Sequence, residues 1–173
     1  MKTIDRIYTR LLQLMMAFAA AYIGLMMVTI VYIALCRTMG WSYSRYAFPF
    51  VEFGFLYVLA FGSPWMVRTR GHVYIELLTA AVPDAVRRVL TRIVAVLATL
   101  ICAVLAYYTA RITLEQYAFD TYDELRGDLN IKMWYSSWTM PLGFGLMAIE
   151  FFRFIFSREP MHTGKAGVVG EDA

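Results

Sequence analysis

The chain has 173 residues, of which 60% are hydrophobic, and its formal net charge is +3 at pH 7. Soluble domains contain about 45 to 50% apolar residues, whereas the mean hydropathy of this chain is +0.56. These values exclude an ordinary soluble protein. They predict an integral membrane protein in which residues 1–160 form one membrane domain and residues 161–173 form a disordered cytoplasmic tail.

The first long apolar run covers residues 11–36 and contains no charged residue. It exceeds the ~20 residues that a helix needs to cross the hydrocarbon core of a bilayer. Lys2, Arg6 and Arg10 precede it, as in a signal peptide. Because the apolar run is much longer than the roughly 7 to 15 residues of a signal peptide core, we predict an uncleaved first helix.

Three further apolar runs follow, over residues 46–67, 93–110 and 133–149, and Glu52 is the one acid well inside a span. Lipid offers the backbone no hydrogen-bond partners, and these continuous runs lack the alternating polarity of a β-barrel. The sequence therefore predicts an all-α integral membrane protein with four transmembrane helices, at about 11–36, 46–67, 88–111 and 133–156.

A short amphipathic helix is expected between the second and third spans, over residues 72–82. Arg70 and Gly71 end the second helix and permit a turn, and Pro83 stops the new helix. Its apolar positions fall on one side, so it can lie in the plane of the membrane surface. These positions are Val73, Leu77, Ala80 and Ala81.

The loop charges predict the orientation of the chain. Eleven of its sixteen Lys and Arg residues lie in the N-terminal segment, in the connection after the second span and in the C-terminal tail. An excess of positive charge marks the cytoplasmic side, so both termini are expected on the cytoplasmic side of the membrane. The opposite loop, residues 115–128, carries five acids, which suit either a partner contact or simple solvation.

The sequence supplies little that could carry catalysis. Cys36 and Cys102 are expected at different membrane depths, so a disulfide is not expected. His72 and His162 lie outside the spans, which removes the paired ligands of a bis-histidine haem. Protease, hydrolase and phosphate-binding motifs are missing from the sequence. We therefore expect no enzyme activity, no cofactor, no metal site and no nucleic-acid partner.

Two polar features remain as candidate functional residues. A charge at the centre of a transmembrane helix costs about 2.5 to 3.5 kcal/mol, so Glu52 is either a proton-coupling or ion-coupling carboxylate or a structural acid bonded to a neighbouring helix. His72 and Glu76 are four residues apart and form, with Arg70, a polar cluster at the membrane surface. This cluster fits an anchored elbow or the docking of a larger partner.

Small residues predict close helix packing, because lipid leaves packing as the main force between helices. The first span has Ala17 with Ala21 and Ala20 with Gly24, each pair four residues apart. In the later spans we expect packing at Gly54, Gly62, Pro141 and Gly143.

Three motifs in order resemble the DctQ-like small membrane subunit of tripartite ATP-independent periplasmic (TRAP) transporters. The first is the basic exit of the second span followed by Gly-His-Val-Tyr-Ile-Glu-Leu-Leu at 71–78, then a proline and an arginine pair. The others are WSYSRYAFPF at 41–50 and WYSSWTMPLGFG at 134–145. Glu52 departs from the family pattern, in which this stretch is usually apolar.

The resemblance implies a scaffold subunit that stabilises and orients a large many-helix transport subunit (DctM-like) and works with a periplasmic substrate-binding protein (DctP-like). Such a system imports an organic acid with sodium ions, which bind in the large subunit. On this interpretation Glu52, Arg70, His72 and Glu76 lie at the subunit interface, surrounded by membrane lipids. The alternatives are a dimeric four-helix proton-coupled exporter that uses Glu52, and the anchor subunit of a respiratory complex.

Overall fold

The part of the chain that the structure describes is built from helices and their connections. The structure is a computed structural model and describes residues 2–69, 84–124 and 129–156. Its helices are α1 (Lys2–Met39), α2 (Ala47–Arg68), α4 (Asp84–Ala118), the short α5 (Trp134–Ser137) and α6 (Thr139–Phe156). Four spans are long and apolar enough to cross a membrane, and α5 and α6 together make the last of them.

The predicted all-α fold with four spans is therefore confirmed. The amphipathic helix expected over 72–82 and the tail 161–173 lie outside the described residues. The helices α1 and α4 are longer than their apolar runs, since α1 begins at Lys2 and α4 continues to Ala118. Hydropathy marks only the part of a helix inside the hydrocarbon core, whereas the backbone hydrogen bonds continue into the polar flanks.

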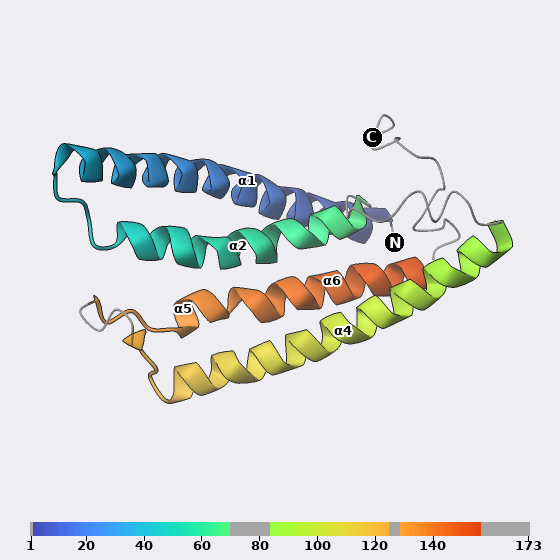
Figure 1. Cartoon of the computed structure of the whole chain (residues 1–173). Coiled ribbons are helices and arrows are strands. Elements are labelled where there is room, and N and C mark those ends of the chain that lie inside the picture. The colour runs from blue at the N-terminus through green and yellow to red at the C-terminus, as the bar shows by residue number, and fades with distance from the viewer. Residues whose placement is uncertain (1, 70–83, 125–128, 157–173) are drawn as a thin grey trace.

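The spans lie side by side in a row, in the order α1, α2, α6, α4 (Figure 1). Among the described elements, the main contacts between spans are α1 with α2, α2 with α6, and α6 with α4. The edge helices α1 and α4 do not form such a pair with each other, so the described spans do not close into a bundle. The start of α1 and the end of α6 lie at the same end of the row, as an even number of spans requires (Figure 1).

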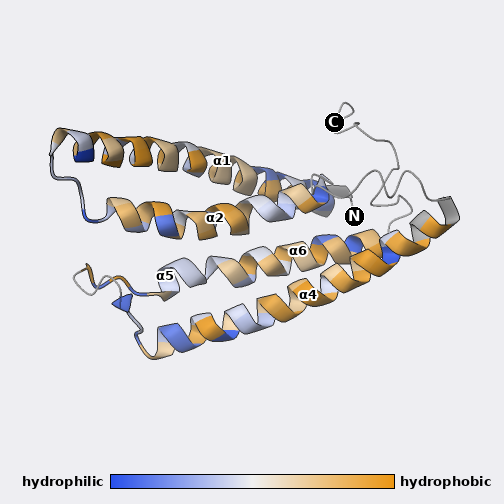
Figure 2. Ribbon diagram, viewed as in Figure 1, coloured by the Kyte–Doolittle hydropathy of each residue, from blue (hydrophilic) through white to orange (hydrophobic). Residues whose placement is uncertain are grey.

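The edge helix α1 touches the row along one narrow seam. Its buried residues Leu12, Ala19, Met26 and Ile33 are each seven positions apart. A seven-residue spacing keeps one stripe of a helix facing its neighbour when the two helices coil around each other. Most of the remaining surface of α1 is apolar and exposed, in keeping with a lipid-facing helix (Figure 2).

The other edge helix, α4, packs in the same manner against α6. Its buried residues Thr91, Ala95 and Cys102 lie along one side of the helix. Cys102 joins Val67 of α2 and Phe151 of α6 in the apolar core of the row. Both cysteines of the chain are free and buried.

The two central helices approach most closely where Gly143 of α6 meets Ala60 of α2. A Cβ atom on Gly143 would lie 2.7 Å from the Ala60 Cα and 2.9 Å from its carbonyl oxygen. Pro64 lies inside α2 and has no N–H, so the Ala60 carbonyl lacks its usual donor four residues later. The proline and the glycine together allow α6 to pack directly on the α2 backbone.

Turns with backbone hydrogen bonds follow α1 and α4 at the end of the row opposite the start of α1 and the end of α6 (Figure 1). After α1, Gly40 adopts a φ of +71° and the Trp41 amide donates to the Cys36 carbonyl at 2.8 Å, which is the Schellman ending of a helix. After α4, an isolated bridge joins Tyr122 to Lys132. The Lys132 ammonium donates to Asp120 at 2.6 Å, and this hydrogen bond raises the pKa of Lys132.

Replacing Gly143 with alanine should destabilise the protein by about 1 to 3 kcal/mol, because the new methyl group overlaps the α2 backbone. The control is Gly145→Ala, since no atom lies within 4 Å of a Cβ at Gly145. The midpoint of denaturant unfolding in detergent measures both variants. Equal midpoints for the two variants would contradict the close contact of α2 and α6.

Candidate functional site

The main polar site of the described residues lies at the end of the row that holds the start of α1. Three helices end there with charges of the sign that their dipoles favour. Asp5 is in the first turn of α1, Arg68 in the last turn of α2 and Arg153 in the last turn of α6. Because one positive and two negative helix ends meet, their charged side chains attract one another.

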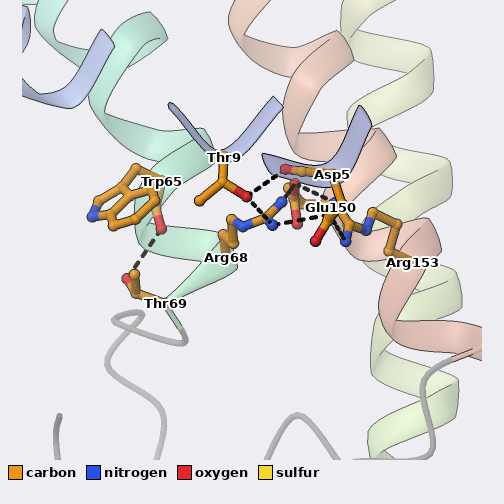
Figure 3. Close-up of polar contacts among 7 residues, drawn as sticks. All are labelled: Asp5, Thr9, Trp65, Arg68, Thr69, Glu150 and Arg153. Carbon is orange, nitrogen blue, oxygen red and sulfur yellow. Dashed lines mark hydrogen bonds and ion pairs between the residues drawn. The ribbon is translucent and has the colours of Figure 1, made fainter. Parts of the chain in front are cut away.

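Arg68 lies at the centre of this site (Figure 3). Its Nη1 is 3.1 Å from the Glu150 Oε1, and its Nη2 is 3.2 Å from the Asp5 Oδ1. The same Nη2 donates to the Thr9 hydroxyl at 2.6 Å. One guanidinium group thereby connects α1, α2 and α6.

Arg153 completes the arrangement from α6. Its Nη2 lies 2.7 Å from the Asp5 Oδ1 and its Nη1 lies 3.6 Å from the Glu150 Oε1. Two arginines and two acids therefore share contacts with no net charge (Figure 3). We call Asp5, Arg68, Glu150 and Arg153 the polar brace.

The ring of Tyr8 supports both arginines of the polar brace. The guanidinium carbons of Arg68 and Arg153 lie 5.5 and 5.7 Å from the ring centroid, within the range of a cation–π contact. Tyr8 belongs to α1, so this contact adds to the attachment of α1 to the two central helices.

Burial distinguishes the members of the polar brace. The side chain of Glu150 is 3% exposed and that of Arg68 is 17% exposed, whereas Asp5 and Arg153 are about half exposed. A buried charge that loses its partner is strongly destabilising, while an exposed pair contributes little. The contact between Arg68 and Glu150 is therefore the critical one.

Aromatic contacts join the same three helices further along the row. Tyr22 of α1 stacks on Phe50 of α2 with centroids 4.9 Å apart, and Tyr57 of α2 meets Trp138, next to α6, at 6.3 Å. The Tyr57 hydroxyl also donates to the carbonyl of Tyr135 in α5. The polar brace and this aromatic group hold α2 and the last span together at two separate levels.

The arrangement is suited to holding helices, since every member of the polar brace pairs with a member on another helix. Within residues 2–69, 84–124 and 129–156, no three His, Cys, Asp or Glu side chains gather as they would around a metal ion.

Of the residues predicted to lie at the subunit interface, the structure describes only Glu52. Glu52 is exposed on α2, away from the polar brace, and Arg70, His72 and Glu76 lie outside the described residues. Gly54 lies against Tyr22 and Met26 of α1, and Gly62 is 3.8 Å, measured from a built Cβ, from the Ala19 Cβ. Pro141 lies in the first turn of α6.

The four small residues of α1 that were predicted to pack do not contact the other helices that the structure describes. Ala17, Ala20, Ala21 and Gly24 are exposed, and no atom lies within 4 Å of a Cβ built on Gly24. Their spacing permits close helix contact, but the seam with α2 lies on the other side of α1.

The polar brace was not predicted from the sequence, and the prediction that Glu52 is the one acid well inside a span was wrong. Glu150 lies within the last span, six residues before its described end at Phe156, and is buried. The predicted span 133–156 already contained Glu150, but only its uncharged part, residues 133–149, was considered. The sequence did contain a signal for these contacts, because Glu150 is followed three residues later by Arg153 near the end of a helix.

The comparison with protein-family models decides the family. Residues 26–159, well over half of the chain, match the model described as tripartite ATP-independent periplasmic transporters, DctQ component. The chain belongs to the DctQ family. It is accordingly a small membrane component of a TRAP transporter, and the resemblance inferred from the sequence motifs is confirmed.

The family match includes Arg68, Glu150 and Arg153 but begins after Asp5. The part of the polar brace on α1 is thus outside the matched region. No curated protein and no solved structure matches the chain.

Replacing Glu150 with leucine should lower the free energy of unfolding by about 2 kcal/mol or more, because the largely buried ion pair is broken and the half-buried Arg68 loses a charged partner. The double variant Arg68→Met/Glu150→Leu should recover part of this loss, since no unpaired charge remains buried. Denaturant unfolding in detergent measures both variants.

The control for these variants is Arg111→Met, which removes an exposed ion pair with Glu115. Its stability should change little, because exposed pairs contribute little. A double variant less stable than Glu150→Leu alone would show that Arg68 stabilises the row mainly through its other contacts.

Proposed function

We propose that this DctQ-family chain is the scaffold subunit of a sodium-coupled, binding-protein-dependent importer of an organic acid. Its role is to stabilise and orient the large transport subunit, which carries the sites for the solute and for sodium. The organic acid, the sodium coupling and the two partner proteins are what membership of a TRAP transporter system implies. We expect the chain in the bacterial inner membrane with both termini in the cytoplasm.

The single observation that carries the scaffold role is the open row of spans. Transporters bind solutes near the membrane midplane, at sites enclosed between helices or repeats. The spans that the structure describes form a row one helix thick, which leaves no interior between them in which such a site could be enclosed (Figure 1). The solute must therefore move through another subunit.

The ion pairs of the buried acid in the last span also support the scaffold role. Intramembrane charges in transporters usually mark the path of an ion or a solute. In this chain the buried Glu150 instead pairs with Arg68 and Arg153 at the end of the row. The charge of Glu150 therefore stabilises the packing of the helices within the subunit.

The purified chain, reconstituted alone in lipid vesicles, should move no organic acid with a sodium gradient and should carry out no proton-driven export. Co-expressed with the large subunit, it should purify in a complex with it. Solute flux assays and affinity purification test the two parts of this expectation.

The dimeric exporter gives the opposite result in the same vesicles. Proton-driven flux by the chain alone that disappears in Glu52→Gln would favour that alternative. Failure of the large subunit to purify with the chain, in detergent and in nanodiscs, would contradict the scaffold role.

A further inference from the structure

The outward face of α2 carries a carboxylate among apolar side chains. Five exposed residues lie on this face. Each follows the previous one by three, four or seven positions in the sequence, and these spacings place all five on one side of the helix. They are Phe48, Glu52, Phe55, Leu59 and Met66. We call this set the α2 stripe.

The contacts of α2 with its two neighbours use its other sides. Gly54 faces Tyr22 of α1, and Ala60 faces Gly143 of α6. The α2 stripe is directed away from both contacts, so the described helices leave it uncovered. Phe55 is 64% exposed and Leu59 is 53% exposed.

Glu52 lies within the hydrocarbon core. Arg45 and Arg68 flank the span and are 23 residues apart, or about 35 Å along a helix, slightly more than the ~30 Å core. Glu52 follows Arg45 by seven residues, about 10 Å along the axis.

The outward faces of the other spans are different. Residues 11–36, 93–110 and 133–149 contain no charged residue, and exposed side chains such as Leu25 and Leu100 suit lipid. Acidic side chains at this depth are rare and almost always face protein or a water-filled cavity, whereas Glu52 is exposed on α2. The α2 stripe is therefore suited to a protein neighbour.

We propose that the α2 stripe is the surface on which the large transport subunit docks, and that a transmembrane helix of that subunit places a positively charged side chain against Glu52. Opposite charges within a dry interface fix the register of the two chains. Phe55 and Leu59 provide the apolar contact beside the ion pair. The inference rests on the proposed function and assigns that function to one face of the row.

Photo-cross-linking tests the docking surface in the assembled complex. The photoreactive amino acid p-benzoylphenylalanine is placed at Leu59 in the α2 stripe or at Leu100 on the outward face of α4, which is 58% exposed. The chain is expressed with the large subunit and the binding protein, and membranes are irradiated. We expect an adduct with the large subunit from position 59 and at most about one-tenth as much from position 100.

The other outcomes overturn the proposal in different ways. An adduct from position 100 but not from position 59 would place the large subunit against α4. Adducts from position 59 only with a second copy of this chain, or only with lipid, would give the α2 stripe another occupant. Failure of the large subunit to purify with the unmodified chain would overturn the proposed function itself, and the docking surface with it.

Substitutions of Glu52 test the charge. Glu52→Lys should reduce the large subunit recovered with the chain by about tenfold or more, because two positive charges would meet in a dry interface. Glu52→Gln, which keeps a hydrogen-bonding group, should have a smaller effect. The control is Glu124→Lys, an exposed acid in the connection after α4, and it should leave recovery unchanged.

The unfolding of the chain alone separates docking from an internal role. Glu52→Leu should leave its unfolding midpoint unchanged or higher while still reducing recovery of the large subunit. A lower midpoint with unchanged recovery would make Glu52 an internal structural acid. Full recovery with Glu52→Lys would contradict the positively charged partner.

Discussion

Lipid provides no hydrophobic force between transmembrane helices, so the spans of this chain are held together by close packing and by polar contacts. The polar brace joins α1, α2 and α6 at one end of the row, where Arg68 contacts both Asp5 and Glu150. In the middle, Gly143 allows α6 to rest on the backbone of α2. The position of every other helix depends on this central pair.

The central pair also explains the open shape of the subunit. With α2 and α6 in direct contact, α1 and α4 attach at the two edges, each along one seam. Over the described residues this arrangement exposes a large apolar surface, and the spans do not surround a path across the membrane. Such a shape suits a subunit that braces a larger membrane protein, and Glu52 distinguishes the face of α2 from the lipid-facing surfaces.

Hydropathy was sufficient to predict the four spans, because long uncharged runs have few alternatives in a membrane. It could not predict the order of the helices, because the spacing of small residues shows where contact is feasible without naming the neighbour. Gly54 and Gly143 meet other helices, whereas Ala17 and Gly24, with similar spacing, face outward. Glu150 was missed because its neutralising partner Arg68 is 82 positions away, and only the fold brings the two together.

The most direct test of the scaffold role is the thermal stability of the large subunit, purified with and without this chain. Its melting temperature should fall by several degrees when the chain is left out, and should fall partly when Glu150→Leu weakens the polar brace. A large subunit that melts at the same temperature in all three preparations would contradict the claim that this chain holds it in shape.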